Sequence, residues 1–353
     1  MKRRLLGLGA AGALAAAGTA AGIVARRRLS EYSRIRSSLL RGDVEVLGSL
    51  RSDPVVVITE DDVALHVEVD EPSGEADPDE PTLVFVHGFA LHLDCWHRQR
   101  AWAREQGLRA VYYDQRSHGR SGRSAREDAT VEQLGHDLAA VLDAVTDGPV
   151  VLVGHSMGGM TVLALVEERP ELFGEKVVGV ALVSTTAGGL RPGRLVAPFL
   201  PERLTGTIAP RLVAALARMP DLVDGARRRG SDLGTVVVSR FAFGDRVDPA
   251  TATFVDEMLA EAPFEVLSEF FDNFADMDKF GVLQTLAHVP TTIICGTLDR
   301  MTSIGHSRKM AARLPSATLV ECPGAGHMVI LEQPVRVNAA LADLVTAAWA
   351  GRG

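Results

Sequence analysis

Residues 149–159, PVVLVGHSMGG, carry the clearest structural signal in this chain. The segment opens with β-branched apolar residues, which favour a buried strand, and an apolar helical pattern follows it. Between the two, Ser156 stands in the pattern G-x-S-x-G with another glycine behind it. A serine on so sharp a strand-to-helix turn is exposed at the edge of a sheet, and side chains two positions to either side would collide. The segment therefore predicts a nucleophilic serine.

A serine hydroxyl needs a base to take its proton. Among ten histidines, His327 has the best context, because it lies on the glycine-rich loop of CPGAGHMVILEQP, directly after the last apolar strand. Two histidines end strands and are expected to pack beneath the site: His87 and His155. Three could reach the pocket rim, although exposed positions fit them better: His92, His97 and His306. Four have no supporting context: His66, His118, His136 and His288.

The base in turn needs an acid that holds its tautomer. Asp299 ends the strand TTIICGTLD, which precedes the strand of His327, and this gives the chain order Ser, Asp, His. Asp114 also ends a strand, but it precedes the serine and opens the turn DQRSHGRSG. We expect Asp299 to be the acid and Asp114 to brace its turn.

Two backbone N–H groups must stabilise the oxyanion that forms when the serine attacks a carbonyl. Met157 follows the serine at the start of the predicted helix and supplies one of them. Phe89 supplies the second from the loop of FVHGF, where Gly88 permits close approach of the backbone. The sequence predicts an oxyanion hole formed by Phe89 and Met157.

The rest of the chain alternates apolar strands with helices, which predicts an α/β fold with a mostly parallel sheet covered on both faces. A hairpin is expected over residues 55–70, and a helix capped by Thr130 ends at Val145. About a hundred residues after Ala187 are helical in pattern without a buried strand, which favours a helical cap over the carboxyl ends of the strands. The predicted parts are an anchor or signal at 1–28, a linker and helical lead-in at 29–54, a core at 55–187 and 289–353, and a helical cap at 188–288.

The charge of the chain is unevenly distributed. Residues 1–28 hold six basic residues and no acid, so the remaining 31 basic and 45 acidic residues give the body a net charge of −14. Such a body repels phosphate backbones, so nucleic acid is not an expected partner. The three scattered cysteines predict neither disulfides nor a zinc site, and no pattern predicts a metal or a cofactor. Two of them are expected in the core: Cys295 and Cys322.

Residues 5–25 contain no charge and lie between basic clusters. As a helix they would extend about 32 Å, close to the thickness of a bilayer core. We favour a membrane anchor over a cleaved export signal because the span is longer than the usual apolar region of a signal and no clean A-x-A cleavage site precedes Arg26, although Arg3–Arg4 loosely resembles a twin-arginine signal. The protein is thus expected to be membrane-associated or exported. The side of the membrane on which the body lies stays open, because the basic residues after the span favour a cytoplasmic body whereas an export signal favours the opposite side.

The segments VFVHGF, YDQRSHGRSG, GHSMGG, CGTLDR and PGAGHMVILEQP occur in an order that resembles the α/β-hydrolase superfamily, over about residues 55–350. The resemblance implies an eight-stranded, mostly parallel sheet with an antiparallel edge strand, and a helical cap between the sixth and seventh strands. It also implies a catalytic triad of Ser156, Asp299 and His327, with Phe89 and Met157 at the oxyanion hole. Ser117 departs from the family pattern, which has glycine there, and this puts the geometry of that turn in question.

The function expected from these residues is hydrolysis of a carboxylic ester, a small lipophilic molecule, through an acyl-enzyme. An apolar acyl or alcohol part is favoured by the phenylalanines of the predicted cap, unless they pack only with one another: Phe199, Phe241, Phe243, Phe254, Phe264, Phe270, Phe271 and Phe274. The same chemistry also serves C–C bond hydrolases, perhydrolases and acyltransferases. A non-catalytic binding protein of this fold, or a membrane scaffold, remains as an alternative of another class.

Overall fold

Strands and helices alternate along the chain in the order that the sequence predicts. The computed structural model describes residues 46–72, 79–190, 241–271 and 273–351. Its strands are β1 (Pro54–Ile58), β2 (Ala64–Asp70), β3 (Thr82–Val86), β4 (Ala110–Tyr113), β5 (Val150–His155), β6 (Val177–Val183), β7 (Thr291–Gly296) and β8 (Thr318–Cys322). Its α-helices are α2 (His97–Gln106), α3 (Val131–Val145), α4 (Met157–Glu168), α9 (Pro249–Glu261), α10 (Phe264–Phe271), α11 (Asn273–Asp276), α12 (Ile304–Arg313), α13 (Val329–Glu332) and α14 (Pro334–Ala350). Short 3₁₀ helices are η1 (Leu93–Trp96), η2 (Arg126–Asp128), η3 (Pro170–Leu172) and η4 (Phe280–His288).

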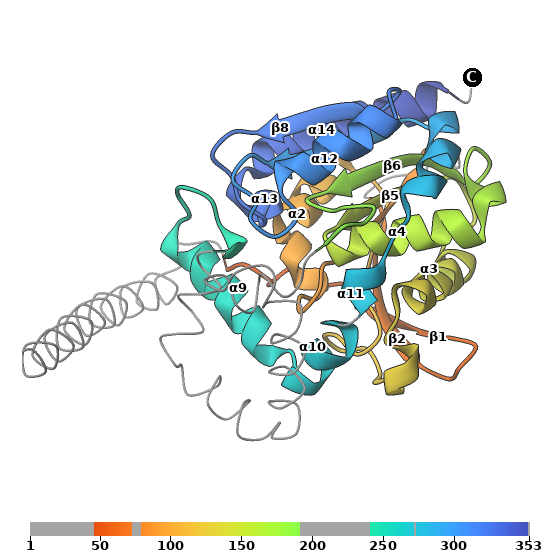
Figure 1. Ribbon diagram of the computed structural model, residues 1–353. Coiled ribbons are helices and arrows are strands. Elements are labelled where there is room, and N and C mark those ends of the chain that lie inside the picture. Colours follow the sequence, from red (N-terminus) through yellow and green to blue (C-terminus); the bar gives the residue numbers. More distant parts are fainter. Residues whose placement is uncertain (1–45, 73–78, 191–240, 272, 352–353) are drawn as a thin grey trace, which may run out of the picture.

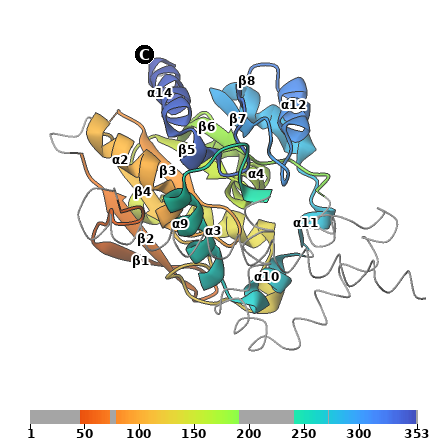
Figure 2. The same cartoon turned by 90° about the vertical axis from the view of Figure 1, so that its left-hand side faces the viewer.

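The strands form one eight-stranded sheet in the order β1-β2-β4-β3-β5-β6-β7-β8. The strands from β4 to β8 in this order pair in parallel, whereas β2 is antiparallel to both of its neighbours, β1 and β4. The strand that runs against the others is therefore second from the edge, and the expectation of an antiparallel edge strand is corrected to this position. Figure 2 shows β1 and β2 at one end of the sheet and β7 and β8 at the other.

The core lies on both faces of the sheet because its central strands are apolar at nearly every position. All residues of β3, β5 and β6 are buried. Successive residues alternate between two apolar layers, as the two-residue period of a strand requires. On β5, Val151 and Val153 face the layer formed with α2 and α14, and Val150 and Leu152 face the layer formed with α3, α4 and α12. The two layers of helices enclose the sheet in Figure 1.

Local signals place the start of α3 and the first hairpin where the sequence predicts them. The hydroxyl oxygen of Thr130 accepts a hydrogen bond of 3.1 Å from Gln133 N at the start of α3, which is the predicted N-cap. The predicted hairpin is present as β1 and β2, with Asp62 at a positive φ in its turn. Aspartate tolerates this left-handed conformation better than most residues, which suits it to the turn.

The helices α9, α10 and α11 follow β6 and precede β7, so they belong to the segment where a cap is expected. Figure 1 shows α9 and α10 outside the two helical layers. The end of the same segment is part of the core, because Leu283 and Leu286 of η4 are fully buried in the layer of α3 and α4. Residues 191–240 lie outside the described residues, and Phe199 with them.

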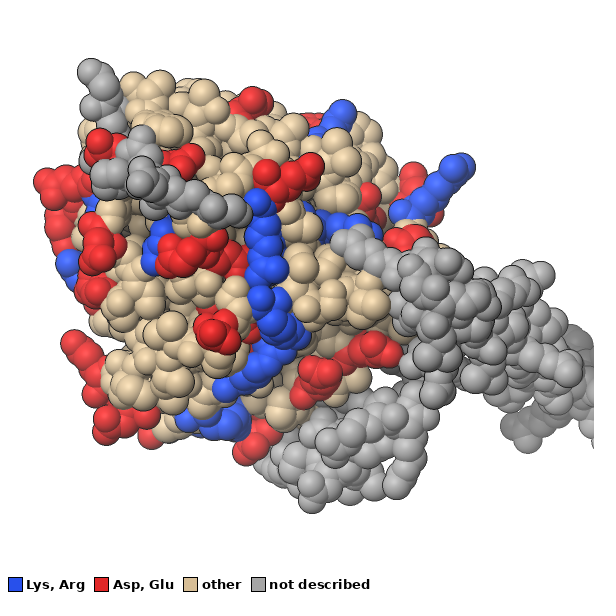
Figure 3. Space-filling model, turned by 180° about the vertical axis from the view of Figure 1, so that it is seen from behind, with Lys and Arg blue, Asp and Glu red and all other residues tan. Residues whose placement is uncertain are grey.

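The predicted anchor at residues 5–25 and the start of the lead-in lie outside the described residues. Of the helices in the described part of the chain, none has the length and apolar character to span a bilayer. The described end of the lead-in is bound to the body, because the Arg51 guanidinium pairs with Asp94 and Ser52 hydrogen-bonds to Glu68 and Asp70. On the face shown in Figure 3, acidic side chains are spread over the surface around a narrow band of basic ones.

Candidate active site

Ser156 occupies a strained turn between β5 and α4. Its φ is 52° and its ψ is −117°, a combination that L-residues rarely adopt. The turn is held at both ends, since Ser156 N donates to Val183 O at 2.9 Å and Ser156 O accepts from the Thr185 hydroxyl at 2.6 Å. Strain of this kind persists where the surrounding structure imposes it and is concentrated at functional sites.

The glycines around the serine are required by close backbone contacts. A Cβ on Gly158 would lie 2.0 Å from the Val86 carbonyl oxygen, and one on Gly154 would lie 2.5 Å from the Gly158 carbonyl oxygen. Neither atom can move away, because Val86 belongs to the backbone of β3 and Gly158 to that of α4. The sequence pattern around Ser156 is therefore a steric necessity of the turn.

Replacing Gly158 with alanine is expected to destabilise the fold by more than about 4 kcal/mol, because the added methyl group would overlap β3. Soluble yield and the midpoint of urea denaturation measure the effect. Gly281→Ala is the matched control, since no atom beyond its own stretch of chain lies within 4 Å of the place that its Cβ would take, and its effect should stay within about 0.5 kcal/mol. A Gly158→Ala protein with the wild-type midpoint would contradict the packing described here.

The structure brings the three predicted side chains together, although they lie far apart in the sequence. His327 Nε2 is 2.9 Å from Ser156 Oγ, and His327 Nδ1 is 2.9 Å from Asp299 Oδ2. All three residues are at least nine-tenths buried. Because the carboxylate accepts the proton on Nδ1, Nε2 presents its lone pair to the serine hydroxyl.

Asp299 is held as a carboxylate by its surroundings. Its Oδ1 accepts hydrogen bonds from Met301 N and Thr302 N, at 2.8 and 2.9 Å. Burial by itself would raise the pKa of Asp299, but the charge of His327 and these hydrogen bonds outweigh it, so the pKa lies below its usual value. Thr302 is absent from the residues expected at the site, yet its hydroxyl is 2.9 Å from Asp299 Oδ2 and 2.7 Å from Ser184 O. A threonine three residues after a strand-ending aspartate is the local signal for this turn.

The two scaffold histidines lie beneath the site as expected. His155 Nε2 donates to the carbonyl oxygen of His327 at 3.0 Å, so the residue before the nucleophile fixes the loop of the base. His87 Nε2 accepts from Gln115 N at 2.9 Å. Burial lowers the pKa of both histidines to about 3, so both are neutral at physiological pH.

The loop that carries Phe89 lies close to Ser156. A Cβ on Gly88 would lie 3.1 Å from Ser156 Cβ, so the loop after β3 passes directly beside the serine. Within the described part of the chain, no hydrogen bond occupies the backbone N–H of Phe89 or of Met157. Neither N–H group has a described partner that would compete with a ligand oxygen, as the predicted oxyanion hole requires.

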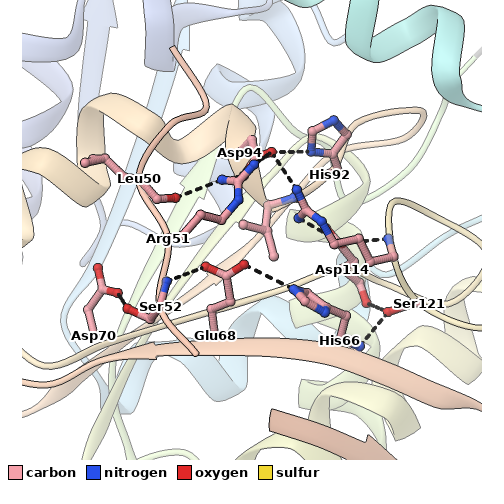
Figure 4. A network of polar contacts seen from close by, with 12 residues as sticks. Leu50, Arg51, Ser52, His66, Glu68, Asp70, His92, Asp94, Asp114 and Ser121 are labelled. Carbon is pink, nitrogen blue, oxygen red and sulfur yellow. Dashed lines mark hydrogen bonds and ion pairs between the residues drawn. The ribbon is translucent and has the colours of Figure 1, made fainter. Parts of the chain in front are cut away.

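Asp114 braces its turn and does not contact His327. Its Oδ1 accepts from Leu93 N at 2.7 Å, and its Oδ2 accepts from Arg120 N at 2.8 Å. Figure 4 shows Asp114 within a polar network that also holds Asp94 and His92. The same turn contains Ser117 at a φ of 63°, which is the left-handed conformation that glycine adopts freely. The serine keeps this conformation, and its hydroxyl lies 3.2 Å from Ser124 N.

One expectation for a histidine is wrong: His97 is buried and not exposed, and its Nδ1 accepts a hydrogen bond from Gly48 N at 3.1 Å. His118, for which the sequence offers no supporting context, is buried between Phe89 and Phe270, with ring centroids 6.0 and 5.5 Å away. No local pattern could have indicated the second contact, since Phe270 lies on α10, far along the chain.

The aromatic residues of the predicted cap do not all face the serine. Phe270 and Phe274 form an apolar cluster with Met157 and Met160 of α4, against which Phe89 packs. Phe243 is buried instead in the layer of α2 and α14. The apolar cluster therefore covers the start of α4, next to Ser156.

The cysteines Cys95, Cys295 and Cys322 are free and buried, as expected for the last two. Burial raises the pKa of Cys295 to about 12 and that of Cys322 to about 11, so neither is a thiolate at neutral pH. Among the described residues, no three His, Cys, Asp or Glu side chains are arranged to hold a metal ion.

Comparisons with known proteins agree with this architecture. Residues 83–340 match the sequence model of the "Alpha/beta hydrolase family". The chain is 28% identical over 260 residues to an sn-1-specific diacylglycerol lipase, ABHD11, of Mus musculus, covering 72% of this chain and 77% of the relative. It is 25% identical over 284 residues to 3-oxoadipate enol-lactonase 2 of Acinetobacter baylyi, covering 80% and 94%. Its fold is similar to that of a thermophilic esterase from Thermogutta terrifontis, with a TM-score of 0.65 and 22% identity, covering 84% of this chain and 99% of the esterase.

Proposed function

Because the chain belongs to the alpha/beta hydrolase family, we propose that it is a serine hydrolase that cleaves a carboxylic ester through an acyl-enzyme. The observation that carries the proposal is the chain of two 2.9 Å contacts from Ser156 through His327 to Asp299. Relatives named as a lipase and an enol-lactonase support a hydrolytic activity.

In the proposed first step, His327 Nε2 accepts the proton of Ser156, and Oγ attacks the ester carbonyl carbon. The carbonyl oxygen becomes an oxyanion, which accepts hydrogen bonds from the backbone N–H groups of Phe89 and Met157. The imidazolium formed on His327 is stabilised by the carboxylate of Asp299, whose lowered pKa keeps it ionised. Collapse of the intermediate breaks the C–O bond, and the imidazolium protonates the leaving alcohol.

In the second step, His327 takes a proton from water, and the resulting hydroxide attacks the acyl carbon of the ester bond to Ser156. The tetrahedral intermediate uses the same two backbone donors. Its collapse releases the carboxylic acid and returns the proton to Ser156, so the enzyme is restored. The whole cycle needs only groups of this chain and one water molecule.

An apolar substrate fits the residues next to the serine. The cluster of Phe89, Phe270 and Phe274 adjoins Met157, which follows the nucleophile. An acyl or alcohol chain bound there would bury apolar surface, which stabilises the complex by about 0.8 kcal/mol for each CH₂. We propose that this part of the substrate is lipophilic.

With p-nitrophenyl esters, kcat/KM should therefore rise with acyl length, and Phe270→Leu should reduce the octanoate-to-acetate ratio of kcat/KM by about tenfold. The ratio does not depend on the fraction of active enzyme. Phe280→Leu is the matched control, because that ring stacks under Lys309 and Arg313 and away from the cluster. A flat response to acyl length, together with a flat response to the alkyl length of acetate esters, would exclude a lipophilic site.

We propose that residues 5–25 target the protein to a membrane, either as an anchor that is retained or as an export signal that is cleaved. Support comes from their uncharged composition and the flanking basic residues. Mass spectrometry of the N-terminus of protein purified from cells tests this proposal. An intact N-terminus in a carbonate-washed membrane fraction indicates an anchor, a new N-terminus near residue 26 indicates a cleaved signal, and an intact chain in the wash contradicts both.

A further inference from the structure

The segment 242–245, which precedes α9, lies directly on the loop that carries His327. Met328 N donates to Ala242 O at 2.8 Å, and Asp245 N donates to Gly324 O at 3.0 Å. A Cβ on Gly244 would lie 2.0 Å from Gly324 O, so the two backbones touch and only glycine fits between them. The loop that carries His327 and the segment 242–245 are therefore packed backbone against backbone.

One carboxylate joins the two segments at this contact. Glu332, at the end of α13, accepts from Gly326 N with Oε1 at 2.9 Å and from Gly244 N with Oε2 at 2.8 Å. Gly326 is the residue immediately before His327. A shift of this carboxylate therefore displaces the peptide that leads into the base, and it also releases the segment at Gly244.

We propose that Glu332 is a positioning residue, which holds the His327 loop and the segment 242–245 in the one arrangement that aims His327 at Ser156. The inference rests on the proposed function, since it assigns Glu332 to the geometry of the same site. Glu332 has no contact with Ser156 and acts through the backbone of Gly326. Its two bonds couple the base to the segment that leads into α9.

The charge of Glu332 bears on this role. Burial raises its pKa to about 7, although the N–H groups of Gly244 and Gly326 oppose the shift. The titratable and charged groups around it come from β8, the loop after β7, the His327 loop, the segment 242–245 and α14: Cys322, Asp299, His327, Asp245 and Arg336. An ionised carboxylate accepts with both oxygens, whereas a protonated one places a hydrogen on one of them. The two bonds are therefore complete only above about pH 7.

The first test is kinetic. Glu332→Gln retains the shape but has one acceptor oxygen, so one of the two segments is released, and kcat should fall about tenfold with KM changed by less than about twofold. Glu321→Gln is the matched control. Glu321 lies on β8, is more exposed than Glu332, and pairs with Arg308. Because both bonds are complete only when Glu332 is ionised, the comparison is made at pH 8, and unchanged kcat there in folded Glu332→Gln would overturn the proposal.

The stability of the variant gives a second readout. A carboxyl whose pKa is raised in the folded state binds protons more tightly there than in the unfolded chain, so stability falls as pH rises from about 4.5 to about 7. Glutamine cannot titrate. The melting temperature of Glu332→Gln relative to wild type should therefore rise between pH 5 and pH 8, whereas kcat relative to wild type falls. A difference in melting temperature that is independent of pH would contradict this.

The wild-type protein itself provides the decisive measurement. The backbone amide signals of Gly244 and Gly326 should titrate together in NMR spectra with a midpoint of about 7. The shift should persist in His327→Gln and vanish in Glu332→Gln. Different midpoints for the two glycines would overturn the proposal. If the wild type neither reacts with a fluorophosphonate nor hydrolyses esters, the proposed function fails, but these two signals still decide whether Glu332 joins the segments.

Discussion

Ser156→Ala is expected to reduce kcat for ester hydrolysis by about a millionfold, because the methyl group cannot attack a carbonyl and His327 has no hydroxyl to deprotonate. The fold should be retained, since alanine keeps the Cβ and leaves the backbone bonds to Val183 and Thr185 intact. Hydrolysis of a p-nitrophenyl ester measures the rate, and circular dichroism monitors the fold.

A fluorophosphonate probe identifies the nucleophile independently of the substrate. It should label the wild type and leave Ser156→Ala unlabelled. Ser184→Ala is the matched control, because Ser184 is also buried, also has a positive φ and directly follows the neighbouring strand, but its hydroxyl has no bond to His327. Labelling that survives in Ser156→Ala would place the nucleophile elsewhere, and a folded wild type without labelling would favour a ligand-binding protein.

Asp299→Asn should reduce kcat by about ten-thousandfold. The carboxamide can donate to His327 Nδ1, which favours the tautomer with the proton on Nε2, and this tautomer cannot accept the proton of Ser156. The bonds from Met301 N and Thr302 N to Oδ1 can persist, so the turn should stay folded. Kinetics with the same ester, and thermal unfolding, separate the loss of rate from any loss of stability.

Asp114→Asn is the matched control for the acid. Asp114 is as buried as Asp299 and also follows a strand, but its carboxylate accepts from the backbone N–H groups of Leu93 and Arg120. The amide nitrogen of asparagine cannot accept one of these bonds, so stability should fall by about 1–3 kcal/mol while the folded protein keeps most of its activity. A harmless Asp299→Asn beside an inactive but folded Asp114→Asn would reverse the assignment.

The fold was predictable because its main signals are local. Buried strands alternate with amphipathic helices, and each signal is contained within about ten to fifteen neighbouring residues. The turn at Ser156 was predictable for the same reason, since the steric limits at Gly154 and Gly158 act over a few residues. The direction of β2 relative to β4 was not, because pairing partners are chosen by the assembled sheet.

The same distinction between local and long-range signals applies to the candidate site. Its strand-end residues could be named from the sequence, because the carboxyl ends of parallel strands meet at one edge. The contact of His118 with Phe270, and the bond from Gly244 to Glu332, join segments that are distant in the chain. Phe270 lies on α10 and Gly244 lies before α9, and the positions of both depend on how the inserted segment packs on the core.

By itself, the sequence determined the order of the elements, the strained serine and the residues able to supply a base and an acid. Only the tertiary structure selected partners on the inserted segment: the backbone of Gly244 for Glu332, and Phe270 for Phe89. The physical reason is the distance along the chain over which each interaction acts. Steric limits and hydrophobic periodicity act between neighbours in the chain, whereas hydrogen bonds and ring contacts between distant residues exist only after the sheet has brought their segments within a few ångströms.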